Sequence, residues 1–170
     1  MSKTINWGIM ATGKIAHTFA KAVNAAEGAR LYACASRDGE KAAAFAAEHG
    51  AEKSYGSYEE LAADPNVDIV YVASPMSCHY ENVKLCFERG KNVLCEKSIT
   101  MDSEQLAELV KTAKKKDLFF MEAMWTKCLP SFLKAKEWVQ AGKIGEIRAL
   151  RADFSNPVDF DPRNRLFRSE

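Results

Sequence analysis

The stretch Ile5-Asn6-Trp7-Gly8-Ile9-Met10, followed at once by Ala11-Thr12-Gly13-Lys14-Ile15-Ala16, joins a short apolar run to a turn and an amphipathic segment. Its second half matches G-x-G-x-x-A, the pattern of a dinucleotide-binding turn, except that Ala11 replaces the first glycine. Gly13 would let the backbone approach a pyrophosphate, and the new helix would attract it with its positive N-terminal end. We expect Ala11 to serve the tight turn only with a negative φ. A plain strand-to-helix turn would use similar residues. Whether this turn binds a dinucleotide therefore has to be judged from the segments around it.

The rest of the chain alternates apolar runs with amphipathic segments. The pattern predicts strands over 5–10, 31–35, 68–73, 92–95 and 118–122, and helices over 13–25, 38–50, 57–64, 78–89 and 102–116. Asp38 and Ser57 are suited to cap helices, and Gly50 to end one. The apolar run from Asp68 to Ala73 is typical of a central parallel strand covered on both faces. The sequence therefore predicts an α/β fold with a doubly wound parallel sheet.

The alternation changes after Glu122. Leu129-Pro130 opens a predicted helix, and Ile147 to Phe154 alternates as an antiparallel strand would. We expect a dinucleotide-binding Rossmann domain over residues 1–124 and the beginning of a second, α+β domain over residues 125–170. The second segment is too short for a core of normal size.

The end of the second predicted strand indicates which nicotinamide cofactor the chain prefers. An NAD enzyme presents an acidic residue to the ribose 2′-hydroxyl about 20 residues after the glycine turn, but here the strand ends Ala35-Ser36-Arg37. Ser36 offers a hydroxyl, Arg37 a bidentate guanidinium, and Lys41 a second cation one helical turn away. These groups suit a 2′-phosphate, so NADP is expected in preference to NAD. The alternative is that Arg37 is simply a solvated arginine.

Composition excludes several classes of protein. Among 170 residues, 24 Lys and Arg against 23 Asp and Glu leave a formal net charge of +1, so no global field favours nucleic acid or a membrane surface. The apolar runs are too short to cross a bilayer, and the N-terminus lacks the apolar core of a signal peptide, so a cytoplasmic location is expected.

Five cysteines without a C-x-x-C pair predict reduced thiols. His17, His49 and His79 are widely spaced, so no metal site is expected.

Four segments together give the chain a family resemblance: the turn from Ala11 to Ala16, Ser36-Arg37, Ser74-Pro75 with His79, and Cys95-Glu96-Lys97. They resemble the glucose–fructose oxidoreductase and inositol dehydrogenase family over essentially the whole chain. The chain looks most similar to the dimeric dihydrodiol dehydrogenase and D-xylose dehydrogenase branch, and Met121-Glu122-Ala123-Met124-Trp125 is among the most specific features of the resemblance. The resemblance implies hydride transfer between a nicotinamide and a CH–OH carbon, with a sugar, polyol or diol as small-molecule substrate.

The resemblance also assigns roles to residues. It makes Lys97 the catalytic residue, whose ammonium would face the nicotinamide and stabilise charge as the hydride leaves the substrate. It places Trp125 and Phe154 along the substrate pocket. Ser98 stands where the family has a proline, which loosens the expected aim of Lys97. The cofactor-binding residues that follow from the turn, the second strand and the resemblance are Ala11, Thr12, Gly13, Lys14, Ile15, Ser36, Arg37, Lys41, Ser74, Pro75, His79, Glu96 and Lys97.

Two other functions fit the same segments: a nicotinamide-binding sensor without turnover, and a nicotinamide-dependent glycoside hydrolase. The family continues beyond the segment that matches Asp153-Phe154 to a tyrosine or histidine that acts as general acid and base. We therefore expect this chain to be truncated, to bind cofactor and to catalyse poorly. We also expect it to self-associate as a homo-oligomer through the strand over 147–154, whose edge would be unpaired.

Overall fold

A computed structural model describes residues 4–153, 155, 157 and 159–162 of the chain. The chain divides into two compact units, Met1–Trp125 and Thr126–Glu170. Within the described residues, none of the helices combines the length and hydropathy that a membrane crossing requires. The candidate site described below lies in the larger unit.

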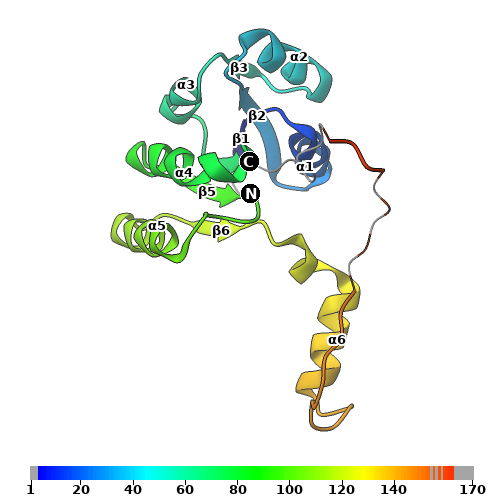
Figure 1. Cartoon of the computed structure of the whole chain (residues 1–170). Coiled ribbons are helices and arrows are strands. Elements are labelled where there is room, and N and C mark those ends of the chain that lie inside the picture. The colour runs from blue at the N-terminus through cyan, green and yellow to red at the C-terminus, as the bar shows by residue number, and fades with distance from the viewer. Residues whose placement is uncertain (1–3, 154, 156, 158, 163–170) are drawn as a thin grey trace. The chain divides into compact units, whose positions relative to one another are not determined.

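The larger unit is a six-stranded parallel sheet flanked by helices (Figure 1). The strand order β3-β2-β1-β4-β5-β6 divides the sheet into two halves that meet between β1 and β4, which confirms the predicted doubly wound fold. The short edge strand β3 was not predicted, because it has three residues and two of them, Lys53 and Ser54, are polar and exposed. In chain order the elements are β1 (Ile5–Met10), α1 (Lys14–Ala25), β2 (Ala29–Ala35), α2 (Gly39–His49), β3 (Lys53–Tyr55), α3 (Tyr58–Ala63), β4 (Ile69–Val72), the 3-10 turn η1 (Met76–Cys78), α4 (His79–Glu88), β5 (Asn92–Cys95), α5 (Ser103–Lys116) and β6 (Phe120–Glu122).

The strands end in register. Six residues are cross-strand partners in one row across the sheet: Tyr55, Ala35, Met10, Val72, Cys95 and Glu122. Because all the strands are parallel, the chain leaves each of them at the same edge. The segments that follow β1, β2, β4 and β5 are therefore gathered along that edge.

The core has two halves, one on each face of the sheet. On one face, α3, α4 and α5 bury Leu61, Phe87 and Leu109 against the strands, and on the other α1 and α2 bury Ala20 and Phe45. All four residues of β4 are buried, as its continuous apolar run predicts. The sheet is therefore covered on both faces.

Local signals in the sequence set the helix ends. The Asp38 side chain accepts hydrogen bonds from the backbone N–H groups of Glu40 and Lys41 at the start of α2, and Gly50 ends this helix with a φ of 73°. The Ser57 side chain caps α3 in the same way. The three predicted helix-capping residues are therefore confirmed.

The 3-10 turn η2 (Trp125–Cys128) begins at the last residue of the larger unit and continues into the smaller one, which also contains α6 (Pro130–Gln140). The helix predicted after Leu129-Pro130 is confirmed, but the strand predicted over 147–154 is wrong, because residues 147–153 are irregular and exposed. Phe154 itself lies outside the described residues. A strand needs a hydrogen-bonding partner, and the described part of this unit holds no second strand.

Asp64, directly after α3, ties the edge strand β3 to the rest of the sheet. Its carboxylate accepts hydrogen bonds from the Tyr55 hydroxyl at 2.5 Å, the Asn66 backbone N–H at 2.8 Å and the Lys53 ammonium at 3.4 Å. Burial raises the pKa of this carboxyl, but the three donors outweigh burial and hold the pKa at about 2. The ionised form is therefore favoured in the folded protein.

We expect Asp64→Asn to lower the free energy of unfolding at pH 7 by roughly 1–3 kcal/mol, the usual cost of breaking buried hydrogen bonds to a charged group. Because the folded pKa lies below the unfolded value, this stabilisation is complete above pH ~4 and is lost as the pH falls towards 2. Urea unfolding of both proteins between pH 2 and 7 measures the difference. A gap between them that does not narrow in acid would contradict the assignment.

Candidate cofactor-binding site

The segments that follow β1, β2, β4 and β5 form one continuous edge. Backbone hydrogen bonds extend the sheet one residue beyond the strands: Ala11 N–H donates to Ala35, Ala73 N–H to Met10, and Glu96 N–H to Val72, each at 2.9–3.0 Å. The strand order reverses between β1 and β4, which is where open α/β sheets bind their ligands. This places two of the four predicted segments, those after β1 and β4, directly at the switch point, and the other two, after β2 and β5, on either side of it.

The turn between β1 and α1 leaves an open helix end. Gly13 is the N-cap of α1 and has no side chain with which to satisfy the first N–H groups, in contrast to the side-chain caps of α2 and α3. A Cβ added to Gly13 would meet nothing within 4 Å. Lys14 and Ile15 are exposed on the first turn and Thr12 is half-buried. The backbone donors and the positive end of the helix are thus free to meet an anion.

Ala11 has a φ of +76°, so the expectation of a negative φ is wrong. The turn from the end of β1 into α1 requires the left-handed region that glycine occupies without cost. Ala11 accepts that conformation with a methyl group in place. The turn therefore keeps the geometry of the glycine pattern although the first glycine is absent.

At the end of β2 the charged groups are partly paired with each other. Ser36 is buried and its Oγ accepts a hydrogen bond from Asp38 N–H at 3.2 Å, while the Arg37 side chain is exposed. The Lys41 ammonium lies 3.1 Å from an Asp38 carboxylate oxygen. The hydrogen bond from Lys41 is the main reason why the pKa of the Asp38 carboxyl is lowered. Sequence reasoning did not identify Asp38 as a neighbour of this site.

A second residue absent from the predicted set, Tyr58, lies beside Arg37. Burial raises the pKa of the Tyr58 hydroxyl, and the positive charge of Arg37 acts on that pKa in the opposite direction. Tyr58 is the first residue of α3, so the start of this helix lies beside the segment that follows β2. No pattern in the sequence pairs the two residues, because 21 positions separate them.

His79 is the most buried residue of the predicted set, with 1% of its surface exposed. Its Nε2 lies 2.8 Å from the carbonyl oxygen of Ser74 and its Nδ1 lies 2.8 Å from that of Ser98. Both ring nitrogens therefore face backbone carbonyl oxygens inside the protein, and the cofactor-binding role of His79 stays a prediction. Asn82, three residues further along α4, donates to the Ser74 hydroxyl at 2.8 Å. His79 holds the segment after β5 against the end of β4.

The Glu96 side chain holds the backbone at Lys97 in place. One carboxylate oxygen accepts the hydroxyl hydrogen of Tyr71, and the other accepts Lys97 N–H at 3.1 Å. Burial and the bond to Glu96 both raise the pKa of the Tyr71 hydroxyl, which remains a donor. The Lys97 side chain is exposed at the same edge. Tyr71 itself stacks on Phe19 of α1, with ring centroids 3.7 Å apart.

The remaining predicted residues are placed as follows. Pro75 is exposed and precedes η1, and Ser74 is buried at the end of β4. Trp125 lies at the end of the larger unit with 53% of its surface exposed. Its predicted role in a substrate pocket, like that of Phe154, stays a prediction.

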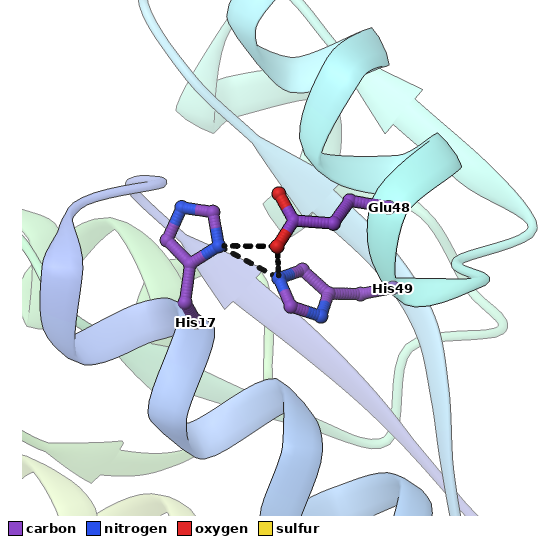
Figure 2. Close-up of side chains that lie close together, drawn as sticks. All are labelled: His17, Glu48 and His49. Carbon is purple, nitrogen blue, oxygen red and sulfur yellow. Dashed lines mark hydrogen bonds and ion pairs between the residues drawn. The ribbon is translucent and has the colours of Figure 1, made fainter.

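The expectation that the histidines are scattered is wrong for two of them. Nδ1 of His17 on α1 lies 2.7 Å from Nε2 of His49 at the end of α2, and the Glu48 carboxylate lies beside both (Figure 2). The separation of 32 positions hid this pair, because only the packing of α1 on α2 brings the two rings together. His79 lies apart from this pair, between the segments that follow β4 and β5.

The geometry of this edge agrees with sequence comparison. The profile of the oxidoreductase family with an NAD-binding Rossmann fold, GFO_IDH_MocA, matches residues 5–124. The chain belongs to this family. The match covers β1 to β6, so it includes every segment of the site described above.

Two relatives come from the branch that the sequence resembles. The chain is 49% identical to a D-xylose 1-dehydrogenase (NADP(+)) of Hypocrea jecorina, over 89% of this chain and 42% of the relative. It is 41% identical to a trans-1,2-dihydrobenzene-1,2-diol dehydrogenase of Xenopus laevis, over 92% of this chain and 48% of the relative. The chain thus spans under half the length of these relatives.

Among solved structures, the fold is similar to an NAD-binding oxidoreductase from Klebsiella pneumoniae. The TM-score is 0.80 and the sequence identity 32%, over 85% of this chain and 40% of that one. The family profile and the structural comparison therefore agree that the chain contains the dinucleotide-binding domain of this family.

Ala11 supplies a direct test of the turn. We expect Ala11→Gly to raise the free energy of unfolding by up to about 1 kcal/mol, because relief of the left-handed strain outweighs the extra entropy of glycine in the unfolded chain. Ala22→Gly, at an exposed position inside α1, is the matched control and should lower it by about 1 kcal/mol. Thermal and urea unfolding measure both. Equal destabilisation by the two substitutions would contradict the strained turn.

Proposed function

We propose that the larger unit is the cofactor half of an oxidoreductase that transfers a hydride between NADP and a CH–OH carbon of a small sugar, polyol or diol. The observation that carries the proposal is the uncapped start of α1 at the switch point of the sheet, with Arg37 at the end of the neighbouring strand. Membership of an oxidoreductase family and the named dehydrogenase relatives support it. The bound nicotinamide would supply the site that accepts or donates the hydride.

The residues present fit a dinucleotide. Thr12, Gly13, Lys14 and Ile15 would hold the pyrophosphate through backbone N–H groups and the positive helix end, in the open space above Gly13. Ser74 and Pro75 would border the cofactor at the end of β4. Ala11 would shape the turn, and Glu96 would act by holding Lys97.

NADP is favoured over NAD by the charges after β2. Arg37 has an exposed guanidinium that can bind a 2′-phosphate in a bidentate manner. Asp38, the nearest carboxylate, already accepts two backbone N–H groups of α2 and the Lys41 ammonium, so it is poorly available to a ribose 2′-hydroxyl. The NADP-dependent D-xylose relative points to the same cofactor.

Lys97 would act on the substrate oxygen. Its exposed ammonium can donate a hydrogen bond to the reacting hydroxyl and stabilise the negative charge that develops as hydride leaves the carbon. Glu96, held in turn by Tyr71, orients the Lys97 backbone. The two relatives suggest a pentose or a trans-diol as the substrate class.

Cofactor choice is tested by titrating the chain with NADPH and NADH and following fluorescence. We expect NADPH to bind more tightly, and Arg37→Ala to weaken NADPH by roughly 1.5–3 kcal/mol while leaving NADH almost unchanged. Arg30→Ala is the matched control, since Arg30 lies near the opposite end of β2 and pairs with Glu52. Equal affinity of the parent chain for both cofactors would refute the NADP assignment.

The role of Lys97 needs turnover, which we would measure in a chimera that joins this chain to the remaining residues of the D-xylose dehydrogenase relative. Lys97→Met should lower kcat by on the order of 100-fold or more with D-xylose, because a group that stabilises the transition state is removed. The Kd for NADPH should stay within about threefold, since the proposed place of Lys97 is at the reacting oxygen and away from the adenylate half. Unchanged kcat in the variant would show that Lys97 is only a surface lysine.

A further inference from the structure

A cluster of three side chains lies on the face of the sheet covered by α1 and α2, and the proposed function does not use it. His17 comes from α1, and Glu48 and His49 come from the last turn of α2 (Figure 2). One atom of each converges: Nδ1 of His17, Oε1 of Glu48 and Nε2 of His49. We propose that these three atoms bind a divalent transition-metal ion of the Zn²⁺ class, with the remaining coordination position open to water.

The spacing of the three atoms fits such an ion. The two nitrogens lie 2.7 Å apart, and each lies 3.3 Å from the carboxylate oxygen. A point about 2.1 Å from all three atoms exists roughly 1 Å off their plane, and ~2.1 Å is the length of Zn–N and Zn–O bonds in proteins. Widening the gap between the two nitrogens from 2.7 Å to about 3.4 Å would bring the angle between them at the metal to the tetrahedral value.

The chemistry of the three groups also favours a cation between them. A neutral imidazole presents a lone pair at one nitrogen, and a carboxylate oxygen only accepts. One shared proton can join two of the atoms, but it leaves the third with a contact of 3.3 Å. A divalent ion satisfies all three lone pairs at once. Two histidines and one glutamate with an open position are a recurrent zinc ligand set.

The surroundings hold the ligands in place. The side chain of Phe45, which is 2% exposed, contacts both rings, with centroids 4.8 Å from that of His17 and 4.6 Å from that of His49. The Asn24 side chain donates to the His49 carbonyl oxygen at 2.8 Å and so ties α1 to the end of α2. The rings are inclined at 64° to each other, with their centroids 4.9 Å apart.

The local field at the end of α2 points to a positive charge as well. The C-terminal end of a helix is its negative end, and an acidic residue in the last turn, such as Glu48, is unfavourable there. A metal ion bound by Glu48 and His49 reverses that disadvantage. The opposing group is Lys21, which lines the same shallow depression as Glu48 and His49. Lys21 is exposed to the solvent.

The test is titration of the full chain with Zn²⁺, followed by calorimetry and by NMR of the imidazole rings. The chain has three histidines, and the third is an internal control, because both nitrogens of His79 are engaged by backbone carbonyls. We expect a saturable 1:1 complex that shifts the ring signals of His17 and His49 and leaves those of His79 in place. Saturation at 100 times Kd should raise Tm by about 5–10 °C.

Substitutions at the exposed ligands make the test specific. Glu48→Gln and His17→Gln should each weaken Zn²⁺ binding tenfold or more, and Glu59→Gln, an exposed carboxylate of α3, should leave it unchanged. Lys21→Gln should strengthen binding severalfold, because a repelling cation is removed. If Zn²⁺ were bound instead by the exposed thiols of Cys78 or Cys128, its affinity would be the same in all these proteins.

Two results would overturn the proposal. In the first, Zn²⁺ at millimolar concentration leaves the signals of His17 and His49 unchanged, which means that the rings share a proton only. In the second, Glu48→Gln binds Zn²⁺ as tightly as the parent chain. The measurements use no nicotinamide, so failure of the metal site and failure of the proposed function are distinguishable.

Discussion

The pairing of β4 with β1 on one side and β5 on the other is the constraint on which the rest of the structure depends. It aligns Met10, Val72 and Cys95 in one row, so that three chain segments leave the sheet at the same height. Because β4 is buried on both faces, a slip in its register would expose part of an apolar strand. The cost of that exposure fixes the relative positions of Ala11, Ser74 and Glu96 before any ligand is present.

The sequence predicts the architecture well because its signals are local. The apolar run before Asp38 and the alanine-rich segment after it define a strand and a helix, and Gly50 marks where that helix ends. The strand expected after residue 146 shows the limit of such signals. Alternation of polar and apolar residues states which face a strand would bury, but it does not supply the neighbour that the strand must pair with.

The site is less predictable, because it rests on contacts between distant residues. The turn before α1 was identifiable from its pattern, but the positive φ of Ala11 is imposed by the sheet to which Ala11 is bonded. The bond between Tyr71 and Glu96 joins β4 to the segment after β5, and the meeting of His17 with His49 requires two helices to pack. The aromatic and charged residues involved are spaced without any repeating pattern, so no motif announces these contacts.

The two contacts of the His79 ring have a mechanical consequence for the larger unit. A single imidazole lies 2.8 Å from the carbonyl oxygen of Ser74, after one central strand, and 2.8 Å from that of Ser98, after the next. These two loops therefore form one bracket instead of two independent arms. A movement at the end of β4 would be transmitted to the loop that carries Lys97, so the parts of the edge that would hold the nicotinamide and act on the substrate would shift together.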